Sequence, residues 1–281
     1  MILRWLDSAG WALFLGFGWA SLAFLVLPTL VVVPMSFGEN QFLEFPPSGF
    51  TLAWYRDYFT DPTWIKPTLF SFQIAFLVAL GSTIVGTATA LALVRGRPAY
   101  RDTLQLFVLS PVIAPNIVVG LAMFFFFAEL HMIGNLWAFV IGHSVLAIPY
   151  VVLSVSAALQ RADHSLELAA LGLGASRVRA FFLVTVPSIR AGIISGAIFA
   201  FIISFDEPVI SFFVSGVDDK TLPRRMFENI EYTVTPTIAA VASLLTAFTA
   251  LLLLLVLAVR LSSGARRTPA GGDVDTDSGG R

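Results

Sequence analysis

The sequence predicts an all-α membrane protein whose helices cross the bilayer six times. Hydrophobic residues make up 57% of the 281 residues, charged residues make up 12%, and the mean hydropathy is +0.84. Soluble domains carry roughly 25% charged residues, so this composition indicates a chain that lies mostly in lipid. A membrane-spanning helix needs about 20 predominantly apolar residues. Six segments meet that requirement: residues 11–36, 68–94, 103–128, 133–159, 188–214 and 236–260.

The distribution of Lys and Arg predicts that both termini are cytoplasmic, because positive residues near short loops tend to stay on that side. Twelve of the 17 positive residues fall on the side of the termini, and five fall on the opposite side. The loop of residues 161–187 then faces the cytoplasm. Residues 262–281 are rich in Gly, Ser, Asp and Thr and are expected to be a disordered cytoplasmic tail. The transmembrane domain therefore spans residues 1–261.

The first apolar segment, residues 11–36, is expected to be retained as a helix. It is too long for a signal-peptide core, and no small-residue cleavage site follows it. The loop from Gly38 to Pro67 then lies on the extracytoplasmic side and is rich in Trp, Tyr and Phe. Aromatic side chains at the level of the lipid headgroups are one explanation of that composition.

Asn116 in the third segment and His143 in the fourth are polar residues that each allow two interpretations. Asn116, between Pro111 and Pro115, predicts a bent third helix, and its amide is either satisfied by a neighbouring helix or contacts a substrate. His143 in the fourth segment is expected to be hydrogen-bonded between helices rather than to bind a metal, because no second His, Asp or Glu lies at metal-ligand spacing. We therefore expect no metal site.

The cytoplasmic loop, residues 161–187, interrupts the apolar pattern with a short helix. Asp163 or Ser165 can cap a helix from about Leu166 to Leu171. Glu167 in its first turn suits the positive end of the helix dipole.

Two glycines then end this helix, and a second one follows. Gly172 and Gly174 stop the first helix, and Ser176 can cap the next, which runs through Val186 along the lipid surface. Pro187 fits the first turn of the fifth membrane helix, where a missing amide hydrogen costs little.

Two acidic residues inside the fifth apolar segment indicate a substrate pathway. Ionised groups at membrane depth cost at least about 2.5 kcal/mol for Asp on insertion scales, and they usually line a polar path or have a partner. Pro208 leaves the carbonyl of Ser204 without its helical donor, which favours a break. Asp206 and Glu207 are therefore predicted to attract a cation. The alternative is that they are structural acids paired with His143 or with an outer-loop Arg.

The run LELAALGLGASRVRAFFLVTVP resembles the EAA loop of the inner-membrane permease subunits of ABC importers. The matching positions are Ala169, Ala170, Leu173, Gly174, Ala175, Ser176, Phe181 and Pro187. In that family, which has the type I importer fold, the short helix is a coupling helix seated in a cleft of a separate ATPase subunit. The resemblance implies ATPase coupling by Glu167, Leu168, Ala169, Ala170, Leu171, Gly174, Ala175 and Ser176.

One position departs from the family pattern, because Leu168 stands where a Glu is usual and the nearest acid is Glu167. One residue on a helix is about 100° of rotation, so Glu167 does not simply replace that Glu. It either faces another basic group on the ATPase or only favours the helix N-terminus.

Four further runs resemble the polyamine branch of these permeases, the spermidine and putrescine type: LPTLVVVPMSF, FPPSGFTLAWYRDYFTDPTW, SFDEPVISFFVSG and TLPRRMFENIEYTVTPTIAAVASLL. The resemblance implies a subunit of the bacterial inner membrane that pairs with a second permease, a homologue, above ATPase subunits. A periplasmic substrate-binding protein is expected to dock on the Gly38–Pro67 loop together with Asp218, Asp219 and Lys220.

Several functions are disfavoured by what the sequence lacks. No G-x-x-x-x-G-K-[ST] motif occurs, so energy must come from a partner. No hydrolase motif occurs either, and neither an enzymatic activity nor a cofactor is expected. The net charge of -1 argues against nucleic-acid binding, and the absence of Cys excludes disulfides. The alternative function is a secondary carrier for a small cationic solute, driven by an ion gradient, in which Asp206 or Glu207 titrates.

Overall fold

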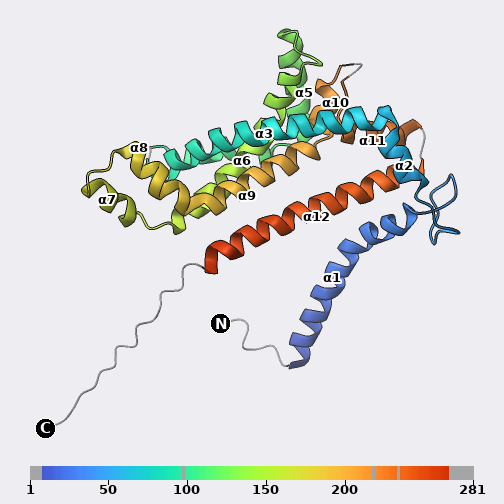
Figure 1. Ribbon diagram of the computed structural model, residues 1–281, viewed down its shortest axis with the longest axis horizontal. Helices are drawn as coiled ribbons and strands as arrows, with labels where there is room; N and C mark the ends of the chain where they lie inside the picture. The colour runs from blue at the N-terminus through green and yellow to red at the C-terminus, as the bar shows by residue number, and fades with distance from the viewer. Residues whose placement is uncertain (1–7, 97–98, 217–218, 233–234, 266–281) are drawn as a thin grey trace.

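The computed structural model describes residues 8–96, 99–216, 219–232 and 235–265. The elements of this part of the chain are all helices, which confirms the predicted all-α class (Figure 1). In chain order they are α1 (Ser8–Met35), α2 (Ala53–Thr60), α3 (Pro62–Val94), α4 (Arg101–Ile113), α5 (Asn116–Glu129), α6 (Leu136–Arg161), α7 (Ser165–Gly172), α8 (Arg177–Ala180), the π-helical turn η2 (Phe181–Thr185), α9 (Val186–Phe205), α10 (Val209–Val214), α11 (Leu222–Tyr232) and α12 (Pro236–Ala265).

The described residues contain five continuous helices long and apolar enough to cross a membrane, and a sixth span if α4 and α5 count as one broken span. The third apolar segment is therefore not a single helix. Its halves meet at 98° because Ala114 and Pro115 have extended backbone conformations, and a residue before proline avoids the helical region. The fifth segment is also broken, between Phe205 and Val209.

Helix α6 forms the centre of the bundle, between α3 and α9 (Figure 1). Glycines on both neighbours face its buried Val151. A Cβ atom added to Gly86 of α3 would lie 2.7 Å from the Val151 Cβ, and one added to Gly196 of α9 would lie 3.2 Å from the Val151 Cα. Lipid gives helices no hydrophobic reason to associate, so such small residues let the backbones approach and pack.

The Gly38–Pro67 segment is more ordered than a simple loop, because it contains α2 and the start of α3. Asp61 accepts a hydrogen bond from the Thr63 amide at 2.8 Å and starts α3 at Pro62, earlier than the expected residue 68. Tyr58 and Trp64 are buried, where they pack with α11 and α12. These two rings therefore lie packed inside the bundle rather than exposed on its surface.

The structure also differs from the expectation of a separate surface helix that runs through Val186. Arg177 to Phe205 forms one continuous helix, so no separate surface helix ends at Val186. The π-helical turn explains the continuity: the Val186 amide donates to the Phe181 carbonyl five residues earlier. This wider turn precedes Pro187, whose missing amide costs nothing in the first turn of α9.

The C-terminal helix and the tail complete the chain. Helix α12 continues to Ala265, past residue 261, and the remainder of the predicted tail, residues 266–281, lies outside the described residues. Helix α1 makes its main contacts with α12, and no residue in its apolar window is buried (Figure 1). Its surface is therefore available to lipid or to another subunit.

Candidate functional site

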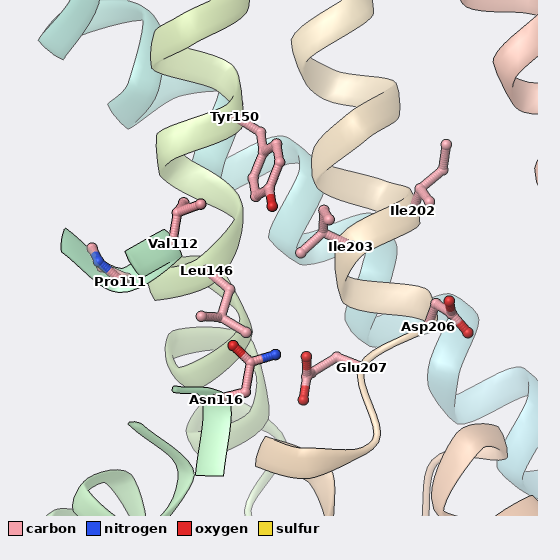
Figure 2. Close-up of a pocket in the computed structure, with 9 residues that line it drawn as sticks. All are labelled: Pro111, Val112, Asn116, Leu146, Tyr150, Ile202, Ile203, Asp206 and Glu207. Atoms are coloured by element: carbon pink, nitrogen blue, oxygen red, sulfur yellow. The ribbon is translucent and has the colours of Figure 1, made fainter. Parts of the chain in front are cut away.

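Two helix breaks lie beside each other and enclose a cavity. One separates α4 from α5, the other separates α9 from α10, and α5 packs against α10 (Figure 1). A Cβ atom on Gly120 of α5 would lie 2.7 Å from Cδ2 of Phe213, so the glycine permits this close approach. The cavity, of about 160 Å³, is lined by Pro111, Val112, Asn116, Leu146, Tyr150, Ile202, Ile203, Asp206 and Glu207 (Figure 2).

The three residues predicted from the sequence to lie on a substrate pathway all line this cavity, although they come from two distant segments. Asn116 is the first residue of α5, while Asp206 and Glu207 lie between α9 and α10. Figure 2 shows the Asn116 amide and the Glu207 carboxylate pointing toward one another. The Asp206 carboxylate points away from both, so the two acids face different sides of the break.

Glu207 caps the half-helix that follows it. Its Oε1 accepts hydrogen bonds from the amides of Val209 at 2.7 Å and Ile210 at 3.0 Å. These are two of the amides that a helix N-terminus leaves without partners, and a carboxylate there also suits the helix dipole. The residue is only 6% exposed.

The expected pairing of the acids with His143 or with an outer-loop Arg is not found. Across the ranges that the structure describes, no Lys, Arg or His lies within the 4.0 Å ion-pair distance of Asp206 or Glu207. Backbone amides, rather than a cation, hold Glu207 in place. Its carboxyl group therefore has no basic partner among these residues.

His143 instead joins the two halves of the broken helix, which confirms the prediction of an interhelical hydrogen bond. Its Nδ1 lies 3.1 Å from the Ser204 carbonyl oxygen, and its Nε2 lies 3.1 Å from Ser211 Oγ. Nδ1 also lies 3.0 Å from Ser204 Oγ. A carbonyl only accepts, so the bond to it is made by the tautomer that carries the proton on Nδ1. The Ser204 carbonyl is the one that Pro208 leaves without a helical donor, so the buried imidazole supplies the missing bond.

Tyr150 also contributes to the cavity, and the sequence analysis missed it. It lies in α6, next to Pro149, and Figure 2 shows its hydroxyl directed into the space beside Ile203. A hydroxyl in the middle of an apolar segment was a usable signal. Its distance in sequence from Asn116 and Glu207 concealed the relationship.

A second candidate site lies in the loop of residues 161–187, where α7 occupies Ser165–Gly172. The Asp163 carboxylate accepts from the Ser165 amide at 2.9 Å, and this bond lowers the pKa of Asp163 below its ordinary value. At the other end Gly174 has φ +88°, and the Ala175 amide donates to the Ala170 carbonyl at 3.0 Å. This is a Schellman motif, for which glycine is preferred because of its positive φ.

The start of α8 also follows the prediction. Ser176 Oγ accepts a hydrogen bond from the Arg179 amide at 3.3 Å, so the serine caps this helix. The turn between α7 and α8 is thus fixed by Gly174 on one side and by Ser176 on the other.

Glu167 takes a position that neither expectation described. Its carboxylate forms an ion pair with Arg95 at the end of α3 and accepts a hydrogen bond from Thr185 Oγ1 at 2.6 Å. The side chain is therefore engaged by its own chain, although it also lies in the first turn of α7. Glu167 points toward Arg95, whereas Leu168, which is about 100° further round the helix, is exposed.

The rest of α7 is accessible. No residue of this helix is buried, and it packs on α8 and η2. Leu166 and Leu168 are exposed, and Leu173 is 91% exposed at the turn. Apolar side chains are therefore exposed on α7 and at the turn that follows it.

Residues 82–266 match the family described as "Binding-protein-dependent transport system inner membrane component". The putrescine transport system permease protein PotI of Escherichia coli (strain K12) is 33% identical over 232 residues, covering 79% of this chain and 81% of that protein. The spermidine/putrescine transport system permease protein PotC of Haemophilus influenzae is 31% identical over 224 residues, covering 79% of this chain and 86% of that protein.

A solved structure shares the fold. It is the crystal structure of a bacterial ABC transporter involved in the import of the acidic polysaccharide alginate, with a TM-score of 0.60 and 14% sequence identity. The alignment covers 89% of this chain and 94% of the matched chain. At this identity the likeness concerns the fold alone, and it supports the type I importer architecture.

Proposed function

The chain belongs to the family of binding-protein-dependent transport system inner membrane components, and from this premise we propose that it forms the membrane pathway for a polyamine in an ATP-driven importer. Family membership implies an ATPase, a second permease and a substrate-binding protein as partners. The relatives are named as transport permeases rather than as enzymes. An ion-gradient-driven carrier is not favoured, because that mechanism uses no binding protein.

The substrate class is carried over from the two relatives, whose names specify putrescine and spermidine. Polyamines are flexible aliphatic chains with ammonium groups. A site for them needs anionic or neutral acceptors next to apolar contacts. The cavity at the two helix breaks offers the Glu207 carboxylate, the Asn116 amide and the Tyr150 hydroxyl beside the side chains of Leu146 and Ile203.

A single observation carries the proposal: Glu207 is held by backbone amides and faces the cavity without a counter-ion among the described residues. A negative charge at membrane depth is expensive unless something compensates it. An ammonium group of the substrate would provide that compensation during passage. Asp206, on the exposed side of the break, would attract the cation toward the cavity.

Energy would enter through α7, which we propose as the coupling helix. The contact surface consists of Leu168, Ala169, Ala170, Leu171, Gly174, Ala175 and Ser176. Closure of two ATPase subunits around ATP would draw two such helices together and change the access of the pathway from one side to the other. The permease contributes the differential stability of two conformations.

The orientation of the chain is part of the proposal. The excess of Lys and Arg supports cytoplasmic termini in a bacterial inner membrane. The loop of residues 161–187 would then meet the ATPase. The outer loop around α2 and Asp219 would meet a periplasmic binding protein.

The test is putrescine uptake by proteoliposomes that contain the chain with its second permease and ATPase. Glu207→Gln removes the charge but keeps an oxygen for the two α10 amides. We expect uptake at limiting putrescine to fall by about tenfold or more, since a hydrogen bond to a charged group is worth about 1.5–3 kcal/mol. The matched control is Glu129→Gln, at the exposed end of α5, which should leave uptake unchanged.

Equal uptake by the Glu207→Gln variant would contradict the substrate pathway. An uncoupler added while internal ATP is held constant separates the two energy sources. Uptake that persists supports ATP coupling, and uptake that collapses supports an ion-driven carrier.

A further inference from the structure

The cytoplasmic end of the bundle contains a closed cluster of three side chains from three elements. Glu167 in the first turn of α7 forms an ion pair with Arg95, the residue that follows α3. Thr185 Oγ1, at the end of η2, lies 2.6 Å from Glu167 Oε2, and Arg95 Nη1 lies 3.2 Å from Thr185 Oγ1. Each side chain thus contacts the other two.

The cluster is largely removed from water. The side chains of Arg95 and Glu167 are 20% and 21% exposed, and Thr185 is 1% exposed. Ion pairs on open surfaces contribute little, whereas removing one partner of a sheltered pair leaves a charge without compensation. One further titratable side chain borders the cluster: His164 Nδ1 lies 3.9 Å from Glu167 Oε2.

Packing alone provides little to fix α7. None of its residues is buried, and it packs on α8 and η2, the first turns of the continuous helix Arg177–Phe205. Helix α3, in contrast, belongs to the central core and packs along α6 and α9. The Glu167–Arg95 pair therefore links an exposed helix to one of the central helices of the bundle.

We propose that Arg95 is a positioning residue that fixes α7 to the cytoplasmic end of α3 through Glu167, so that a displacement of α7 moves α3. This inference rests on the proposed function of α7 as the ATPase-coupling helix. Thr185 holds the carboxylate from the other side, which ties the same helix to the start of α9. Force applied to α7 then reaches both α3 and α9.

The arrangement also explains the unusual order of Glu167 and Leu168. The acid is turned inward to Arg95, so the surface left for the ATPase is the apolar one formed by Leu166, Leu168 and Leu173. An internal charge pair and an external apolar contact separate the two tasks of the helix. The pair holds α7 to the bundle, and the leucines meet the partner.

The inference predicts a change in mobility as well as in transport. The chain contains no Cys, so Gly172→Cys introduces a unique attachment site for a spin label at an exposed position of α7, where an added Cβ meets nothing within 4 Å. In the complex with the ATPase, Glu167→Gln and Arg95→Gln should each make this label more mobile. Both variants should also lower putrescine uptake per ATP hydrolysed by about tenfold, while the amount of co-purified ATPase stays within about twofold.

The charge-exchanged variant Arg95→Glu with Glu167→Arg separates pairing from the individual residues. It should restore a large part of the label immobilisation and of the uptake per ATP. A label at Leu183 in η2, which is exposed on a neighbouring element, should be unaffected in all variants and serves as the control.

Two results would overturn the inference. One is unchanged mobility of the residue 172 label in both single variants. The other is loss of ATPase binding in Glu167→Gln but not in Arg95→Gln, which would place the acid at the ATPase. If the unaltered chain purifies without any ATPase, the proposed function fails. The mobility of the label, measured in the chain itself, then decides separately whether the ion pair fixes α7.

Discussion

His143 Nδ1 lies 3.1 Å from the carbonyl oxygen of Ser204, the acceptor that Pro208 deprives of its helical donor. A side chain of α6 thus completes the backbone hydrogen bonding of a broken membrane helix. The break can exist in lipid because the exposed carbonyl has a buried partner. In the other half of the broken helix, Glu207 accepts hydrogen bonds from the first amides of α10, which would otherwise lack partners.

The first prediction concerns this compensation. His143→Ala should destabilise the protein in detergent by about 1–2 kcal/mol, because a buried carbonyl loses its donor. In a Pro208→Ala background the new amide at position 208 can serve Ser204, so the same substitution should cost less. Thermal unfolding of the four variants of this double-mutant cycle measures the difference. Additivity within about 0.3 kcal/mol would show that the two residues are not coupled.

The second prediction concerns the turn after α7. Gly174 has φ +88° and its amide donates to the Leu171 carbonyl at 3.0 Å. Proline is locked near φ −65° and has no amide hydrogen, so Gly174→Pro should abolish putrescine uptake while membrane insertion remains normal. Gly172→Ala, inside the helix and with open space around its Cβ position, is the control that should transport normally. Full transport by Gly174→Pro would contradict the assignment of this loop.

The third prediction concerns the packing of α9 on α6. A Cβ atom on Gly192 would lie 2.5 Å from the Ala158 Cβ and 2.9 Å from the Ser154 carbonyl oxygen. Gly192→Ala should therefore lower the free energy of unfolding by about 1–3 kcal/mol through overpacking. Gly81→Ala in α3 meets nothing within 4 Å and should not destabilise. Unfolding in SDS–detergent mixtures checks both, and equal stability of the two variants would refute the close helix contact.

The fourth prediction concerns the apolar surface proposed for the ATPase. Leu173 is 91% exposed, and placing a charge there should reduce ATPase co-purification by about tenfold, because the apolar contact would bury an unpaired carboxylate. The variant is Leu173→Asp. The control is Leu52→Asp, at an exposed leucine in the outer loop, which should retain the ATPase. Retention by both variants would place the ATPase contact elsewhere on the chain.

A good part of this architecture follows from the sequence alone, because the physics involved is local. Long apolar runs determine which segments can span lipid. The residue order around Gly174 and Ser176 determines a helix end and a helix start within one turn. Pro208 favours a break, since it removes one amide hydrogen from the helix.

Other features depend on contacts between distant residues and could not be inferred. Arg95 and Thr185 are 90 positions apart, and no spacing rule relates either of them to Glu167. The packing of α5 on α10 likewise joins two segments that no spacing rule relates. The burial of Tyr58 and Trp64 against α11 and α12 also depends on residues far away in the sequence.

The sequence thus determined which segments are apolar enough to span a bilayer, where α7 ends and α8 begins, and which carboxylates fall inside an apolar segment. Only the tertiary structure decided that Asn116, Tyr150 and Glu207 share one cavity and that Glu167 faces Arg95. Backbone preferences and hydrophobic transfer act over a few residues and can be read along the chain. The direction of a side chain depends on which helix packs beside it, and that choice is made by the whole bundle.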